Sequence, residues 1–232
     1  MKKSVFSVYF IILTTCFYSS LLGSQISMSN IQSGLSTSLN DDQSKIILLS
    51  GLLGAGLTKN FERKFQEAYS DNLLNPHIAR LGDYWGIAGQ FIILSSMDTK
   101  TNQFRYASNA MLANGLITYS IKFITRKMRP DMSNRRSFPS GHTSASFIAA
   151  TVAHKTYGSQ ISAPAFLLAG LTGISRIHDN KHYLSDVIFG AALGIAIGVG
   201  FNQEFQKGSI QKIDDGGIII KNGYLINFSW SF

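Results

Sequence analysis

The sequence predicts a mostly α-helical, compact bundle that ends in a short C-terminal β-hairpin. Two patterns lead to this fold class. Between residues 46 and 201, apolar stretches of helical length alternate with short polar or charged segments. Over residues 224–232, after a polar link and an Asn-Gly turn, every second residue is apolar, which is the period of a strand. The length of 232 residues suits one domain with short extensions.

The N-terminal residues, 1–24, have the pattern of a secretory signal peptide. Two lysines precede an apolar stretch over 5–16, and the small residues Gly23 and Ser24 follow where cleavage is expected. The apolar stretch is too short for a membrane-spanning helix of about 20 residues. The pattern therefore predicts export into the cell envelope.

Lipid attachment at Cys16 is an alternative, because residues 13–16 weakly resemble a bacterial lipoprotein box. Cys16 is the only cysteine in the chain. Cleavage after residue 24 would remove it, so we expect neither disulfides nor cysteine-based metal sites in the mature protein.

The polar composition of residues 25–44, rich in Ser, Asn and Gln, predicts a flexible segment. A helical domain is expected over 45–205. Pro130 should end one of its helices, because the residue before a proline disfavours the helical conformation. Six helices are expected, over residues 46–57, 85–96, 107–128, 142–156, 163–176 and 183–201.

The last of these helices carries Gly190, Gly194 and Gly198 at a spacing of four, which aligns them on one face. Such a stripe suits close contact between membrane helices, or tight packing in the core of a helical domain. The apolar run over 187–201 is shorter than a comfortable span of about 20 residues, and this favours packing in the core.

The extension over 206–232 contains the predicted hairpin. Asn222-Gly223 separates the apolar run 218–220 from a strand over 224–232 that has one wholly apolar, aromatic face. A terminal Phe resembles the last strand of an outer-membrane barrel. Two strands cannot close a barrel, so we favour a hairpin that packs on the helices.

The net charge of +8 indicates an anionic partner, although solubility alone is an alternative explanation. Five basic residues cluster between 126 and 136, just before a Gly-His pair, which favours phosphate. No nucleic-acid-binding signature is present in the sequence, so no nucleic-acid partner is expected. The mean hydropathy of +0.10 leaves membrane contact open.

Three short motifs carry the chemistry. In the first, Lys122 and Arg129 are seven residues apart, so they would share a face of a continuous helix. Two fixed cations suit the charge of a phosphoryl group. By itself, the pair could also be an ordinary basic helix end.

The second motif is Ser140-Gly141-His142 at the predicted start of a helix. Free N–H groups at such a position bind anions, and glycine lets a ligand approach the backbone. Ser140 could donate a hydrogen bond or simply cap the helix. His142 could transfer a proton near neutral pH.

The third motif contains Arg176, His182 and Asp186. His182 and Asp186 are four apart, which makes them neighbours on a helix. A carboxylate that binds one imidazole nitrogen exposes the other as a nucleophile or base. Arg176 adds a forked donor that suits phosphate. In isolation, the His-Asp pair could be an incidental surface pair.

Together, in this order over residues 122–186, the motifs resemble the signature of the type 2 phosphatidic acid phosphatase and vanadium haloperoxidase superfamily. The three parts are Lys-x6-Arg-Pro, Pro-Ser-Gly-His and Ser-Arg-x5-His-x3-Asp. The resemblance covers about 85–205 and implies the compact helical fold of that superfamily. The segment 177–181 is more charged than the apolar, glycine-containing version common in relatives, which leaves substrate preference open.

The resemblance implies a metal-independent phosphatase that acts through a phosphohistidine. His182 would be the nucleophile, Asp186 would orient it, and His142 would protonate the leaving group and then activate water. It also implies a set of residues that bind the substrate phosphate: Lys122, Arg129, Ser140, Gly141 and Arg176. Three cationic side chains would bind the phosphate in place of a divalent ion, so no cofactor and no metal are expected.

The remaining histidines, His77, His154 and His178, have no partners at metal-ligand spacing and are expected to be structural or exposed. The expected substrate is a phosphorylated lipid or a small phosphate ester, and membrane association is expected with the active site facing the periplasm. A soluble periplasmic acid phosphatase, a vanadate-dependent haloperoxidase and a non-catalytic envelope protein are the alternatives.

Overall fold

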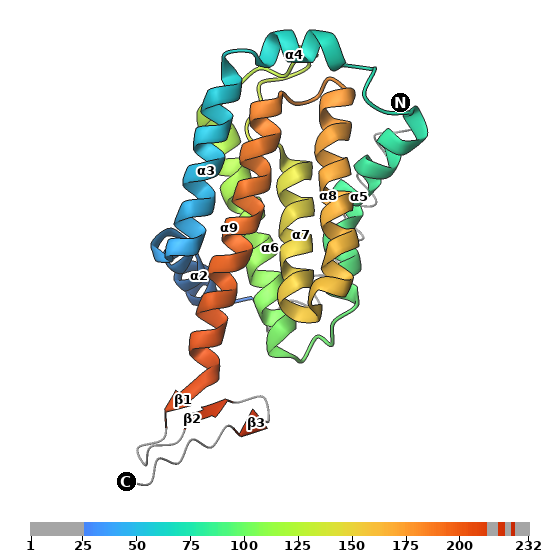
Figure 1. Ribbon diagram of the computed structural model, residues 1–232. Coiled ribbons are helices and arrows are strands. Elements are labelled where there is room, and N and C mark those ends of the chain that lie inside the picture. Colours follow the sequence, from blue (N-terminus) through green and yellow to red (C-terminus); the bar gives the residue numbers. More distant parts are fainter. Residues whose placement is uncertain (1–25, 213–217, 221–223, 226–232) are drawn as a thin grey trace, which may run out of the picture.

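The computed structural model describes residues 26–212, 218–220 and 224–225 (Figure 1). They form a bundle of roughly aligned helices, with α4 across one end and a small sheet after α9. The helices are α2 (Met28–Asn40), α3 (Asp42–Lys59), α4 (Glu62–Tyr69), α5 (Pro76–Ser95), α6 (Asn102–Thr125), α7 (Gly141–Tyr157), α8 (Ser159–His178) and α9 (Leu184–Ser209). The mostly helical fold class is therefore confirmed.

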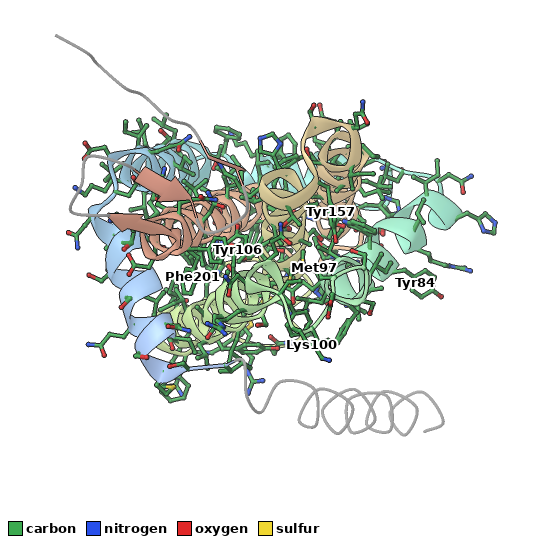
Figure 2. The ribbon with its side chains drawn as sticks, turned by 90° about the horizontal axis from the view of Figure 1, so that it is seen from below. Tyr84, Met97, Lys100, Tyr106, Tyr157 and Phe201 are labelled. Carbon is green, nitrogen blue, oxygen red and sulfur yellow. The ribbon has the colours of Figure 1, made fainter. Side chains whose placement is uncertain are left out.

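The apolar helix α9 lies at the centre of the bundle and packs against α2, α3, α6 and α7. Tyr106 and Phe201 point into the interior, and the hydroxyl of Tyr106 donates to the carbonyl oxygen of Gly198 at 2.8 Å (Figure 2). Tyr84, by contrast, projects outward from α5. The hydrogen bond satisfies a polar group inside an apolar core.

The glycine stripe on α9 faces α7. A Cβ atom on Gly190 would lie 2.7 Å from the carbonyl oxygen of Ser140, and one on Gly198 would lie 2.7 Å from Cγ2 of Thr151. Only glycine allows the two backbones to approach this closely. The stripe therefore serves packing within the bundle, as the shortness of the apolar run predicted.

The prediction of a flexible segment over 25–44 was wrong for Met28–Asn40, which forms α2. Small polar residues let this helix pack closely on α9. Gly34 lies against the ring of Phe201, and the Oγ of Ser38 is satisfied by the carbonyl oxygen of Gly34 at 2.7 Å. A polar composition is compatible with a helix whose contact face is made of small residues.

The end of α6 also differs from the prediction. The helix ends at Thr125, before the predicted 128, and Arg126 follows in the left-handed conformation with φ 46° and ψ 33°. The chain therefore leaves the helix before Pro130, and the proline is not what ends it. Arg129 lies in the loop after α6 and not on its face.

Among the residues that the structure describes, three short strands follow α9: β1 (Ile210–Lys212), β2 (Ile218–Ile220) and β3 (Tyr224–Leu225). They pair antiparallel in the order β1-β2-β3. The Asn-Gly turn and most of the aromatic strand lie outside the described residues, so the hairpin with its apolar face stays a prediction. The predicted signal peptide over 1–24 also lies outside them and stays a prediction.

Apolar side chains cover much of the outer surface of α3. Ile46, Leu49, Leu53 and Leu57 follow helical spacing, and each is more than half exposed. Such a continuous apolar stripe marks a contact surface. One described helix, α9, is also long and apolar enough to cross a membrane, but 72% of its apolar window is buried inside the bundle.

Candidate active site

A cavity of about 560 Å³ lies at one end of the bundle, where α5, α6 and the start of α7 meet the loop after α6. Five of the eight predicted site residues line it: Lys122, Arg129, Gly141, His142 and His182. Residues from three separate sequence motifs therefore share one cavity. The other three predicted residues lie behind its wall.

Lys122, in the last turn of α6, is buried. Its ammonium group donates to the carbonyl oxygens of Arg136 at 2.7 Å, Ser137 at 3.4 Å and Pro139. Burial, together with nearby Arg129, lowers the pKa of Lys122 to about 8. The side chain therefore fixes the loop that forms one wall and keeps a positive charge beside the cavity near neutral pH.

Arg129 contributes the second cation. Its backbone N–H donates to the carbonyl oxygen of Asn134 at 3.0 Å, which holds the loop in shape. Its Nε is buried, and among the described residues it has neither a hydrogen-bond acceptor nor a carboxylate partner. A guanidinium in this condition is available to an anion that enters the cavity.

His142 is the second residue of α7 and faces the cavity. Helix α5 can approach it because a Cβ atom on Gly86 would lie only 2.9 Å from the imidazole Cδ2. Burial lowers the pKa of His142 below its ordinary value, and Arg129 and Lys122 add to the effect. These influences favour the neutral imidazole, and the negative charge of a phosphate beside it would oppose the effect of the two cations and favour the protonated form.

Ser140 and Gly141 begin α7, as predicted, but they face different ways. Ser140 is fully buried. Its Oγ accepts a hydrogen bond from the hydroxyl of Thr143 at 2.8 Å, and its N–H donates to the carbonyl oxygen of Asp186 at 2.9 Å. Gly141 lines the cavity, so a ligand can reach the backbone at the helix start.

His182 lies in the turn before α9 and is only 2% exposed. Its N–H donates to the carbonyl oxygen of Arg176 at 3.1 Å. Its Nδ1 lies 3.7 Å from Oδ2 of Asp186 and makes no hydrogen bond with any described residue. The two side chains are neighbours as predicted, although His182 precedes the helix and only Asp186 is in it.

Burial is also the main influence on the charge of His182. It lowers the pKa of this histidine to about 4; Asp186 opposes the shift, whereas Lys122 and Arg129 add to it. The imidazole is therefore neutral at pH 7. A neutral imidazole has a free lone pair on one nitrogen, which is what a nucleophile requires.

Asp186 is fully buried and tightly held. Its Oδ2 accepts from the hydroxyl of Ser137 at 2.5 Å and from the N–H of Tyr183 at 2.9 Å, and its Oδ1 accepts from Lys127 at 2.9 Å. Burial alone would raise the pKa of Asp186, but His182, Lys127 and Ser137 together hold it below its usual value. The carboxylate is therefore charged and fixed in orientation.

Sequence reasoning missed the network behind Asp186. Lys127 also donates to Oε2 of Glu62 at 2.8 Å and to the hydroxyl of Ser185 at 2.9 Å, which ties α4 to the site. Lys127 was visible in the sequence only as a member of the basic cluster. Glu62 and Ser137 carried no signal, because their roles arise from tertiary contacts.

Arg176 does not line the cavity in the described part of the chain. Its guanidinium pairs with Asp83 of α5 and with Asp179, while its Nε is buried without a described hydrogen-bond partner. Arg136, which the sequence flagged only through the basic cluster, lines the cavity instead. The structure thus brings a different third cation to the cavity wall.

The described residues contain no group of three or more His, Cys, Asp or Glu side chains that could hold a metal ion. Two of the remaining histidines have other partners. Nδ1 of His154 lies 3.0 Å from the hydroxyl of Ser162, and Nδ1 of His178 accepts from the N–H of Leu74 at 3.4 Å.

Parts of the sequence are similar to known phosphatases and their family. Residues 104–208 match the family model of the PAP2 superfamily. A Lipid A 1-phosphatase from Porphyromonas gingivalis is 45% identical over 80 residues, which cover 33% of this chain and 18% of that protein. A PA-phosphatase related-family protein from Dictyostelium discoideum is 28% identical over 151 residues, which cover 56% of this chain and 52% of that protein.

A similar fold is found in the crystal structure of a transmembrane PAP2-type phosphatidylglycerolphosphate phosphatase from Bacillus subtilis. The TM-score is 0.51 at 19% identity, and the match covers 70% of this chain and 94% of that one. At this identity, the likeness concerns the fold alone.

Proposed function

We propose that the protein hydrolyses phosphate monoesters of lipids through a phosphohistidine intermediate, because residues 104–208 match the family model of the PAP2 superfamily. One observation carries the proposal: a single cavity combines two histidines, both with lowered pKa, with the guanidinium of Arg129, whose Nε has no hydrogen-bond partner among the described residues. A lipid phosphate or lipid pyrophosphate substrate is supported by the identity with Lipid A 1-phosphatase. A soluble phosphate ester is the alternative substrate.

In the first step, Nε2 of His182 attacks phosphorus in line with the ester oxygen. The P–N bond forms as the P–O bond breaks, and the imidazolium of His142 gives its proton to the leaving alkoxide. Asp186 faces Nδ1 of His182 and stabilises the positive charge that develops on the ring.

In the second step, water attacks the phosphohistidine. His142, now neutral, accepts a proton from the water as the P–N bond breaks, and inorganic phosphate leaves. The free imidazole of His182 and the protonated His142 are restored, so the cycle consumes only water and ester.

Cations and backbone donors stabilise the negative charge on the phosphoryl oxygens in both steps. Arg129 and Gly141 line the cavity directly, and the N–H of Gly141 is the backbone donor we assign to the phosphate. Lys122 acts through its charge, since its donors already bind loop carbonyls. Arg176 takes part by giving up its ion pairs with Asp83 and Asp179 and binding phosphate oxygens instead. Ser140 takes part by turning its hydroxyl away from Thr143 and towards the phosphate.

The protein acts in the cell envelope, with its active site on the periplasmic side. The exposed apolar stripe on α3 is the surface we assign to contact with lipid. Separation of soluble periplasmic and membrane fractions tests the assignment. Recovery in the membrane fraction supports lipid contact, whereas recovery in the periplasmic fluid favours the soluble phosphatase.

A hydrolysis panel tests the function: an aryl phosphate, phosphatidate and an isoprenyl pyrophosphate, each measured as released phosphate. His182→Ala should abolish release from every substrate. His154→Ala is the matched control, because this histidine lies outside the cavity and contacts Ser162. Wild-type release equal to that of His182→Ala would contradict the proposal.

A further inference from the structure

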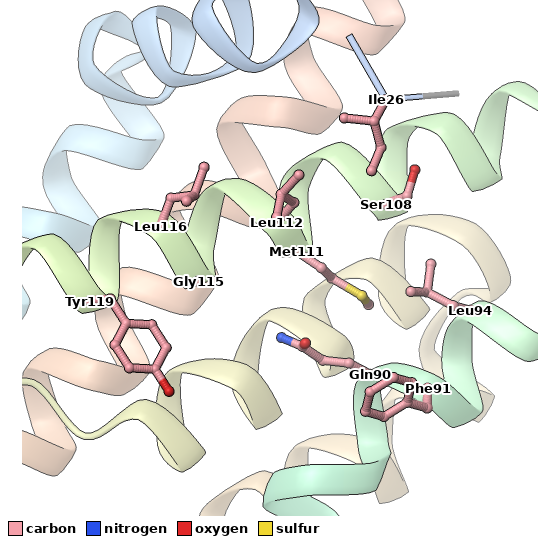
Figure 3. Close-up of a pocket in the computed structure, with 10 residues that line it drawn as sticks. All are labelled: Ile26, Gln90, Phe91, Leu94, Ser108, Met111, Leu112, Gly115, Leu116 and Tyr119. Carbon is pink, nitrogen blue, oxygen red and sulfur yellow. The ribbon is translucent and has the colours of Figure 1, made fainter. Parts of the chain in front are cut away.

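A second cavity of about 540 Å³ lies between α5 and α6, next to the site (Figure 3). Its walls are mostly apolar. Leu94 and Met111 are buried, whereas Leu112 and Leu116 are partly exposed along its edge. We call it the α5–α6 groove.

The α5–α6 groove is continuous with the cavity that holds His182. Gln90, Gly115 and Tyr119 line both spaces. Along α5 the lining passes from Gly86 in the cavity, through Gln90, to Leu94 in the groove. The groove is therefore an apolar extension of a cationic cavity, which is the shape of a molecule with a charged head and an apolar tail.

The groove has a definite length. It follows α6 from Tyr119 to Ser108, and Ile26 and Leu94 line the end that lies farthest from the shared residue Tyr119 (Figure 3). Eleven residues of α-helix rise about 17 Å, which is the length of an extended chain of about a dozen carbons. The volume and length together fit one hydrocarbon chain.

We propose that the α5–α6 groove holds one alkyl or acyl chain of the substrate while its phosphate lies beside His182, and that the groove measures the length of this chain. The inference rests on the proposed phosphatase function and deepens it. Selectivity arises because each methylene that enters the groove leaves water, whereas carbons beyond the last lining residues gain no such burial.

Gly115 is the residue to change. It lies at the junction of the two spaces, and a Cβ atom placed on it would meet no other atom within 4 Å. Gly115→Leu should therefore fold and project its side chain into the junction. Gly170→Leu on α8 is the matched control, because Gly170 is also half-buried in a helix with nothing within 4 Å, and it lines neither space.

The experiment measures kcat/KM for n-alkyl monophosphates of increasing chain length, below their micelle concentrations. For the wild type, kcat/KM should rise about three- to fourfold with each methylene and level off near a dozen carbons. The rise should be lost in Gly115→Leu and kept in Gly170→Leu. A wild-type series that is flat, or a Gly115→Leu series that rises like the control, overturns the inference.

Binding of n-alkylphosphonates, which cannot be hydrolysed, keeps this test separate from the proposed function. Calorimetry should give the same dependence of affinity on chain length, with the same loss in Gly115→Leu. Equal affinity for short and long chains overturns the groove even if the aryl phosphate is hydrolysed. If no ester is hydrolysed, the proposed function fails, and the phosphonate series still decides the inference.

Discussion

Replacing Lys127 with methionine removes the cation that Asp186, Glu62 and Ser185 share next to His182. The side chain of Asp186 is 0% exposed and that of Glu62 is 12% exposed, so both carboxylates would be left charged and largely dry. Methionine keeps the apolar stem of lysine, and the change therefore tests the charge more than the packing.

Breaking a buried ion pair from one side costs about 3–5 kcal/mol. The side chain of Lys127 is 23% exposed, so water can partly replace it, and we expect the lower end, about 3 kcal/mol. For a chain of this length, that loss lowers the melting temperature by about 6–12 °C. Glu62→Gln in the Lys127→Met background should recover part of it, because one stranded charge is removed.

Thermal unfolding of wild type, Lys127→Met and the double variant, in one buffer, measures these effects. Lys155→Met is the control, since Lys155 is exposed on α7 and its replacement should change stability by less than about 0.5 kcal/mol. A melting temperature for Lys127→Met equal to that of the control would refute the reasoning, as would an unchanged value in the double variant.

Four further predictions concern catalysis. His142→Ala should lose about 100- to 10,000-fold on an alkyl phosphate and clearly less on a nitrophenyl phosphate, whose leaving group needs no proton; equal losses in rate assays on both esters contradict the role of acid. Asp186→Asn should lose less than His182→Ala, because the imidazole remains but its orientation is no longer enforced. As the pH increases, kcat/KM should rise when His182 loses its proton, through a pKa of about 4. It should fall again when His142 loses its proton, through a pKa that lies below the ordinary 6.5. In His142→Ala, measured on the nitrophenyl ester, the falling limb should move up towards the pKa of Lys122 near 8, where the cation is lost; a limb that stays in place contradicts this assignment. Activity should survive strong chelation and be inhibited by vanadate, and loss in chelator that magnesium restores would argue against a metal-independent reaction.

The sequence predicted the chemistry of the site better than its geometry. The motifs identified His142 and His182, and the structure brings both to one cavity. Arg176 was expected to face the phosphate, but it pairs with Asp83, which is 93 residues earlier in the chain. No local pattern can predict such a contact, because it depends on how α5 packs on α8.

For the fold, too, local sequence patterns predicted some features, whereas features that depend on tertiary contacts were missed. Helices with long apolar runs were predicted, whereas α2 and α4 were not. The polar helix α4 is anchored through Gln66, whose amide donates to the carbonyl oxygen of Ile177 at 2.7 Å. The end of α6 depends on the left-handed conformation of Arg126, for which its residue type gives no indication. Tertiary contacts, and not composition, determine these elements.

Trapping the covalent intermediate tests the central claim most directly. The enzyme is mixed with a labelled phosphate monoester, quenched in alkali within the first turnover, and digested for mass spectrometry. The account predicts one phosphoryl group on the peptide that contains His182, and none in His182→Ala. A phosphoryl group on another residue, or turnover by the wild type with no phosphoenzyme at all, would contradict it.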